Sequence, residues 1–181
     1  MAAVKNNVFF LTFTAVLSAL IASLMLFSRL IGVADYSCTL LCGLLIGVVV
    51  IECGPVWASG AYVVSSLLGL FLSGNECSLL FLVFFGYYPI VKPLIDRLPK
   101  AVRILLKLLA FNAVIVLSYA LIDAFVLPDL LVLKSGSVWA ILVLLLVANA
   151  VFCLYDILFA RMMSLYMAKL HPTVAKMKKG R

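Results

Sequence analysis

The sequence is poor in charge. Of its 181 residues only 12% are Asp, Glu, Lys or Arg, whereas 67% are hydrophobic, and the mean hydropathy is +1.29. The exterior of a water-soluble domain of this length needs many more polar side chains, since charged residues normally cover it. The scarcity of charge therefore excludes a soluble globular protein and predicts a chain whose solvent is lipid.

The sequence also lacks the residue patterns of self-contained catalysis. It has one histidine, His171, and it has no HExxH pattern, no Ser and His pair, no paired catalytic aspartates and no glycine-rich phosphate loop. Hydrolysis inside a membrane needs a nucleophile with its base, or a metal held by His and acidic groups. Because these patterns are missing, we expect a protein that is not an enzyme, uses no cofactor and holds no metal ion.

The five cysteines form no CxxC pair, and none lies next to the histidine. Cys38 and Cys42 are four residues apart and can therefore share one face of a helix. A thiol in such a place usually acts as a small apolar filler. We interpret the cysteines as packing residues.

Long apolar runs separated by short polar stretches give the organisation of the chain. They predict an all-α polytopic membrane protein with one transmembrane domain of about six helices, because about 20 apolar residues cross a hydrocarbon core of about 30 Å. The predicted helices cover residues 8–31, 37–52, 55–73, 78–95, 103–126 and 138–160, and a basic tail covers 161–181. The first run exceeds the apolar part of a cleaved signal peptide, typically about 7–15 residues, so we expect a membrane helix there.

The basic residues are distributed unevenly between the two ends of these helices. If the N-terminus is cytoplasmic, every one of the 14 Lys and Arg residues except Arg29 and Lys134 falls on the cytoplasmic side. This bias is typical of cytoplasmic loops, and it predicts that both termini lie inside and that the protein resides in the cell (plasma) membrane. The basic tail then either continues the last helix into the interface, where it meets anionic lipid, or forms a solvated segment that sets the topology.

Three ionisable residues are predicted near the inner ends of helices, namely Glu52, Lys92 and Asp156. A charge in a membrane helix usually faces a partner or a cavity, so one hypothesis is an inner polar cluster of these three with Tyr87 and Tyr88. The alternative is that each charge extends separately to the interface. Two prolines follow the tyrosines and predict a kinked helix, which either lines a site or forms an aromatic belt.

A second set of polar residues is expected nearer the middle and the outer side of the membrane. Asn112, Tyr119 and Asp123 are seven and then four residues apart, which places them on one helix face, and Asn149 is expected near the depth of Asn112. With Tyr62, they are candidates for a ligand-binding pocket open to the outside. Because buried amides usually form hydrogen bonds between membrane helices, a structural clasp is the alternative.

A face of small residues and one aromatic run carry a family resemblance. Ala15 and Ala19 lie four residues apart on the first predicted helix, a spacing that lets two membrane helices come close, and they are candidates for a partner-helix face. The run from Phe85 to Lys92 reads FGYYPIVK. With six predicted helices in 181 residues, the chain resembles the substrate-binding S components of energy-coupling factor transporters, or S-component-like membrane proteins of Gram-positive bacteria.

This resemblance implies that the chain binds a small micronutrient, such as a vitamin, for uptake. It also implies a membrane coupling subunit with ATPases as the partner, which would meet Ala15 and Ala19. The residues alone leave two other functions open: a membrane scaffold or assembly factor whose basic cytoplasmic side binds proteins, and a small carrier or channel that uses the inner charges. The lipid bilayer is an expected partner in every case, and nucleic acid is expected in none.

Overall fold

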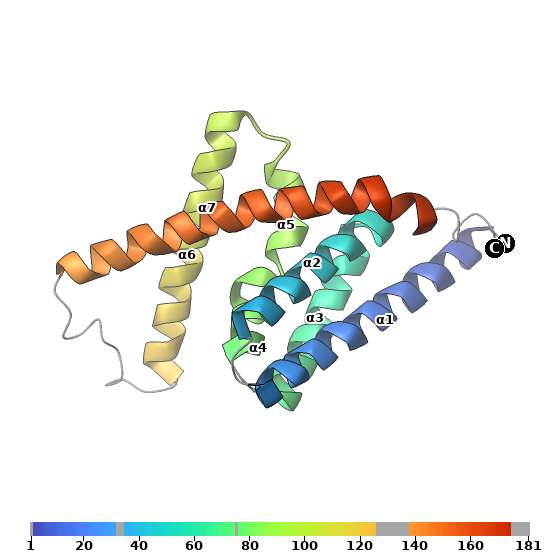
Figure 1. Cartoon of the computed structure of the whole chain (residues 1–181), viewed down its shortest axis with the longest axis horizontal. Coiled ribbons are helices and arrows are strands. Elements are labelled where there is room, and N and C mark those ends of the chain that lie inside the picture. The colour runs from blue at the N-terminus through green and yellow to red at the C-terminus, as the bar shows by residue number, and fades with distance from the viewer. Residues whose placement is uncertain (1, 32–34, 75, 126–137, 175–181) are drawn as a thin grey trace. The chain divides into compact units, whose positions relative to one another are not determined.

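The computed structural model describes residues 2–31, 35–74, 76–125 and 138–174 (Figure 1). Every regular element in these ranges is a helix, as the sequence predicts. The contacts divide the chain into two compact units, which are described separately: the first unit is Met1–Leu94 with Arg161–Arg181, and the second unit is Ile95–Ala160.

Three helices that pack on one another begin the first unit (Figure 1). They are α1 (Ala2–Ile31), α2 (Asp35–Cys53) and α3 (Pro55–Leu72). Gly54 alone separates α2 from α3, and its φ of 91° lies in a region that other residues rarely adopt. Pro55 begins α3, where a missing N–H costs no helical hydrogen bond. Gly54 and Pro55 therefore form a tight hairpin between α2 and α3.

Small residues allow these helices to approach closely. Ala61, Ser65 and Gly69 are buried on one face of α3, and the Ser65 hydroxyl donates a hydrogen bond of 3.5 Å to the carbonyl oxygen of Ser18 in α1. A side chain added at Gly69 would collide with the Sδ atom of Met25. Close backbone contact of this kind is how membrane helices gain packing energy, because lipid supplies little hydrophobic force between them.

The opposite end of these helices is closed by Arg29, one of the two basic residues predicted outside the cytoplasm. Its Nη1 donates a hydrogen bond of 2.8 Å to the carbonyl oxygen of Ser73, the residue that follows α3. The last carbonyl groups of a helix lack partners within the helix, and a cation satisfies them well. Arg29 therefore joins the end of α1 to the end of α3.

The fourth predicted span is irregular. It consists of α4 (Glu76–Leu80), the π-helical segment η1 (Phe81–Phe85) and α5 (Tyr88–Ile95). The sequence predicts a kink from the prolines, but the irregularity begins before them, where Gly86 lies against the ring of Tyr62 so closely that a Cβ would collide with it. Tyr62 also donates a hydrogen bond of 2.7 Å from its hydroxyl to the carbonyl oxygen of Leu82. Widened turns of this kind free carbonyl groups for such partners.

Two long helices form the second unit, α6 (Lys100–Phe125) and most of α7 (Val138–Lys169). The last turns of α7 belong to the first unit. The helix runs past the predicted end at residue 160 because Met162, Leu165, Tyr166 and Lys169 keep the spacing of three and four residues that one helix face requires. The helix thus continues into the basic tail, as the first of the two alternatives for the tail expected, and the position of the tail at the interface stays a prediction.

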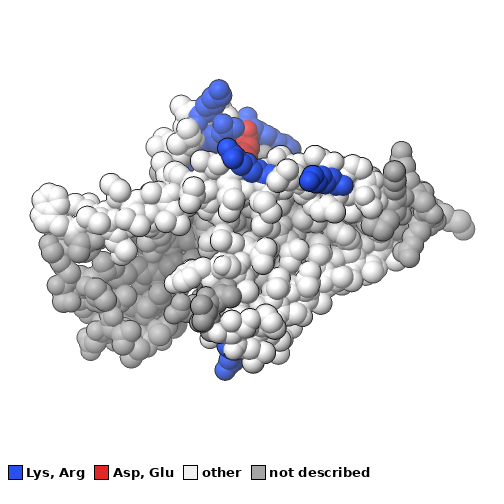
Figure 2. Space-filling view, in the orientation of Figure 1, with Lys and Arg blue, Asp and Glu red and all other residues white. Residues whose placement is uncertain are grey.

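Five described segments are long and apolar enough to cross a membrane, namely Asn7–Ile31, Tyr36–Cys53, Pro55–Leu72, Cys77–Ile95 and Leu142–Lys169. On the face in Figure 2, charged atoms cover small areas and most of the described surface is neither acidic nor basic. Large apolar side chains such as Leu30 and Phe71 are 82% and 86% exposed. Lipid solvates such a surface and water does not, so the chain is a multi-pass membrane protein. A sixth crossing and the inward orientation of both termini stay predictions.

Candidate functional site

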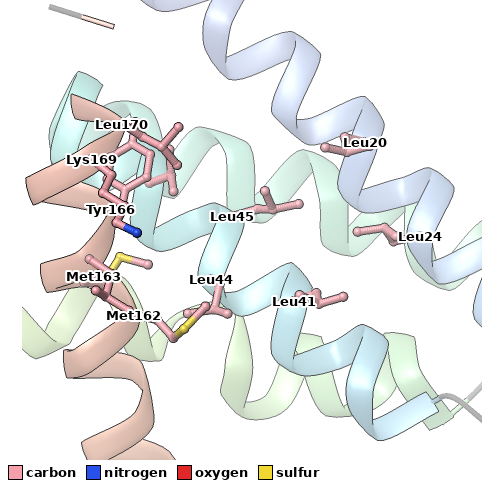
Figure 3. A pocket seen from close by; sticks show the side chains of 12 residues that line it. Leu20, Leu24, Leu41, Leu44, Leu45, Met162, Met163, Tyr166, Lys169 and Leu170 are labelled. Atoms are coloured by element: carbon pink, nitrogen blue, oxygen red, sulfur yellow. The ribbon is translucent and has the colours of Figure 1, made fainter. Parts of the chain in front are cut away.

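An apolar groove of about 580 Å³ lies within the first unit, between α1, α2 and the last turns of α7 (Figure 3). Its volume falls in the range of about 300–1,000 Å³ that is usual for small-molecule sites. Leucine, valine and methionine form almost all of its lining. The lining residues are Leu20, Leu24, Leu41, Leu44, Leu45, Val48, Met162, Met163, Leu165, Tyr166, Lys169 and Leu170.

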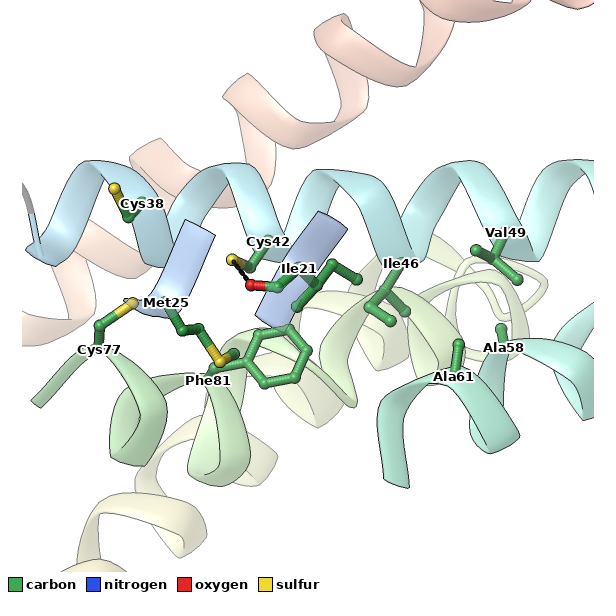
Figure 4. Close-up of a cluster of buried hydrophobic side chains, with 10 residues drawn as sticks. All are labelled: Ile21, Met25, Cys38, Cys42, Ile46, Val49, Ala58, Ala61, Cys77 and Phe81. Atoms are coloured by element: carbon green, nitrogen blue, oxygen red, sulfur yellow. Dashed lines mark hydrogen bonds between the residues drawn. The ribbon is translucent and has the colours of Figure 1, made fainter. Parts of the chain in front are cut away.

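Helical spacing explains how these side chains reach one groove. Residues three or four apart lie on the same face of a helix, and Leu41, Leu44, Leu45 and Val48 follow that spacing along α2. The buried residues of α2 between them, such as Cys42, point instead into a packed core that α1, α3 and η1 also supply (Figure 4). One face of α2 therefore builds the core while the next face builds the groove wall.

The core beside the groove contains three of the cysteines. Cys38, Cys42 and Cys77 are buried there with Phe81, and the Cys42 thiol donates a weak hydrogen bond of 3.8 Å to the carbonyl oxygen of Ile21 (Figure 4). All five cysteines are free thiols, and the described residues contain no group of three or more His, Cys, Asp or Glu side chains that would hold a metal ion. The buried cysteines act here as small core residues.

A buried carboxylate closes the end of α2 next to the groove. The Glu52 side chain is only 3% exposed. Its Oε1 accepts a hydrogen bond of 2.8 Å from the Tyr166 hydroxyl and lies 2.8 Å from Nδ1 of His171. We call Glu52, Tyr166 and His171 the Glu52 network.

Tyr166 belongs both to the Glu52 network and to the groove. Its ring lines the groove, and its hydroxyl reaches Glu52. A carboxylate in an apolar place is costly unless donors surround it, so the two contacts hold the end of α7 against the end of α2. The Glu52 network therefore fixes the position of one groove wall.

Lys92 and the two tyrosines of the hypothesised inner cluster lie near one another in the first unit. The Lys92 Nζ atom lies 5.6 Å from the centre of the Tyr88 ring, a cation–π contact, and both residues are buried. The rings of Tyr87 and Phe84 meet edge to face at 6.1 Å. The lysine charge is thus held against an aromatic face.

Asp156, the remaining member of that hypothesis, pairs with a lysine in the second unit. The Lys107 Nζ atom lies 2.9 Å from Oδ2 of Asp156 and 2.7 Å from Oδ1 of Asp96, and the Lys107 side chain is only 8% exposed. The carboxylate of Asp96 also lies 4.0 Å from Nε of Arg103. The structure gives Glu52 and Asp156 separate partners within their own units, and a single cluster that joins all five predicted residues stays a prediction.

Asn112 and Asn149 form a reciprocal pair in the second unit. The Nδ2 of Asn112 donates to Oδ1 of Asn149 at 3.0 Å, and the Nδ2 of Asn149 donates back to Oδ1 of Asn112 at 3.2 Å. Each amide donates its other hydrogen to the carbonyl oxygen four residues earlier, at 2.7 Å to Leu108 and 2.8 Å to Leu145. All four N–H donors are in use. This is the structural clasp between helices, and a ligand would have to break it.

The other three predicted pocket residues are Tyr62, Tyr119 and Asp123. Tyr62 lies in the first unit and uses its hydroxyl within that unit. Tyr119 and Asp123 lie in α6, but their side chains are outside the described residues. A polar pocket open to the outside therefore stays a prediction.

Ala15 and Ala19 are exposed on α1, whereas Ser18 and Ala22 between and beyond them are buried. The face that the two exposed alanines occupy is therefore available to another helix, and its role as a partner surface stays a prediction. The groove itself was missed from the sequence, because its leucines are indistinguishable by type from leucines that face lipid. Tyr166 was interpreted as part of the tail, although its place on a continued helix was a usable signal.

Comparisons with protein-family models, with characterised proteins and with solved structures found no match for this chain. Its function therefore has to be inferred from the groove, the Glu52 network and the lipid-facing surface.

Proposed function

We propose that this chain is a membrane-embedded binding subunit that takes a lipophilic molecule into the groove of the first unit. The observation that carries the proposal is the groove of about 580 Å³ with its wall of leucine, valine and methionine. Such a wall offers no hydrogen-bonding partners over most of its length, so it favours an apolar chain over a polar vitamin. The lipid bilayer is the source from which this molecule enters.

The uptake role implied by the resemblance to energy-coupled transporters belongs to the same proposal. A subunit of that kind binds the solute and relies on a separate membrane coupling subunit with ATPases. The exposed small residues Ala15 and Ala19 on α1 support this part, because they leave room for a close helix contact. The proposed solute is a lipophilic micronutrient or a lipid, not a polar vitamin.

The Glu52 network supports the proposed orientation in the plasma membrane. Glu52 lies at the end of α2 that is remote from the short connection to α1, so it shares one end of the α1 and α2 hairpin with the first turns of α1. His171 reaches that same end through Glu52. Both ends of the chain on one side, with the basic tail in the cytoplasm, fit this arrangement and the distribution of Lys and Arg.

Blocking the groove tests the proposal. We expect the protein purified from its native membrane to retain a lipophilic molecule that mass spectrometry detects, and we expect Leu44→Trp to lose it because the indole fills the groove. The matched control is Leu67→Trp, which adds the same ring at a position of α3 that is 52% exposed. Equal retention by both variants, or no retained molecule in the unsubstituted protein, would refute the proposal.

A further inference from the structure

We infer that the groove holds an acyl lipid of the surrounding bilayer with an anionic head group, whose chain lies along α2 and whose head group pairs with Lys169. This inference rests on the proposed binding function and adds the chemical class of the ligand. It begins from the lining, in which Lys169 is the one charged side chain among the described residues that bound the groove.

The groove has an apolar end and a basic end (Figure 3). Leu24 and Leu41 lie toward one end of it, whereas Lys169 and Leu170 lie toward the other, on the last turn of α7 and the turn that follows. An elongated apolar wall that finishes at a cation matches a molecule with a hydrocarbon chain and a negative head.

The buried carboxylate of Glu52, at the end of α2, does not cancel this basic end. Glu52 is 3% exposed, and its Oε1 already faces the Tyr166 hydroxyl and Nδ1 of His171. The Tyr166 hydroxyl is thereby directed to Glu52, which leaves the Tyr166 ring to the groove. Lys169, by contrast, is exposed at the end of the helix. The charge offered to a head group at this end is therefore positive.

An anionic lipid also suits the surroundings of the groove. The chain carries a net charge of +7, and an anionic leaflet attracts basic residues near the interface. That general attraction does not by itself select one site. Selection requires that the charge of Lys169 act together with the apolar wall, and the two features are separable by substitution.

The test uses the full chain in detergent and native mass spectrometry with equimolar phosphatidylglycerol and phosphatidylcholine of the same acyl chains. We expect a preference for phosphatidylglycerol at one site, and we expect Lys169→Gln to reduce that preference about five-fold, the equivalent of one lysine near an anionic lipid surface. The matched control is Arg161→Gln, which removes one charge from the same helix at an exposed position outside the groove lining. It should leave the preference unchanged.

The outcomes separate this inference from the proposed function. If Lys169→Gln and Arg161→Gln lower the preference equally, the tail attracts anions without a site and the inference is overturned. If Leu44→Trp abolishes lipid binding while Lys169→Gln changes nothing, the binding function stands and the anionic class is wrong. If sodium oleate displaces the bound lipid and phosphatidylglycerol does not compete, the ligand is a free fatty acid and the assignment to a bilayer phospholipid fails.

Discussion

The two units hold their helices together by different means. In the first unit, α1, α2 and α3 approach closely through glycine, alanine, serine and cysteine, and the polar Glu52 network lies only at one end. In the second unit, polar side chains join α6 to α7 through the ion pair of Lys107 with Asp156 and the reciprocal amides of Asn112 and Asn149. Because lipid competes equally for apolar surface, membrane helices associate through close packing or through polar bonds. Close packing is extensive in the first unit, and polar side chains join the two helices of the second.

Substitution of Lys107, the lysine that Asp96 and Asp156 share in the second unit, is expected to have the largest effect on stability. Lys107→Met deprives both Asp96 and Asp156 of a contact under 3 Å. We expect the free energy of unfolding to fall by about 3 kcal/mol, because a partly buried carboxylate then lacks its cation. Thermal unfolding in detergent measures the change.

The control for this substitution is Lys100→Met, at an exposed position in the same helix, which should change stability by less than about 0.5 kcal/mol. The variant Lys107→Met combined with Asp156→Asn should recover part of the loss. A double variant less stable than Lys107→Met would show that the pair is not what joins the helices.

A methyl group added at Gly86 in the first unit is expected to lower the free energy of unfolding slightly less. In Gly86→Ala the new Cβ would meet the Tyr62 ring and the carbonyl oxygen of Phe81, so we expect a loss of about 2 kcal/mol from overpacking. The matched control is Gly60→Ala, where nothing lies within 4 Å of the new Cβ, and where the higher helix propensity of alanine should give no loss. Equal stability of the two variants would contradict close packing as the principle of this unit.

Loss of the amide pair of Asn112 and Asn149 is expected to have the smallest effect on stability. Asn112→Leu removes both reciprocal bonds at similar volume, and we expect a loss of about 1 kcal/mol, typical of polar contacts between membrane helices. A double-mutant cycle with Asn149→Leu measures the coupling between the two residues. Strictly additive losses would mean that each amide acts on its own helix only.

Much of the architecture follows from sequence because local rules decide it. Apolar run length places the helices, Gly54 and Pro55 mark the hairpin, and the four-residue spacing of Cys38 and Cys42 predicts that they share one face of α2. Asn112 and Asn149 were expected near one depth, and polar groups in lipid seek one another, so the clasp between them was among the interpretations considered. These features depend on one helix or on adjacent helices.

The site depends on contacts that no local rule specifies. Glu52 meets Tyr166 and His171 across 114 and 119 residues of chain, and the hypothesis from sequence had offered it Lys92 and Asp156 instead. Depth in the membrane limits which charges are able to meet, but it does not choose among them. The groove is even harder to predict from sequence, because a leucine that faces lipid and a leucine that faces a cavity follow the same periodic pattern.

The long separation between Glu52 and its partners has a consequence for biosynthesis. A ribosome completes α2 more than a hundred residues before it delivers Tyr166, which is 114 positions later. During that interval the Glu52 carboxylate lacks both of these partners. In a nascent chain that stops before Tyr166, we expect the carboxylate to stay hydrated and the end of α2 to lack its contacts with α7. Docking of the C-terminal turns thus acts as the completion step of folding, and chains cut short before them are expected to be recognised and degraded by quality-control proteases of the membrane.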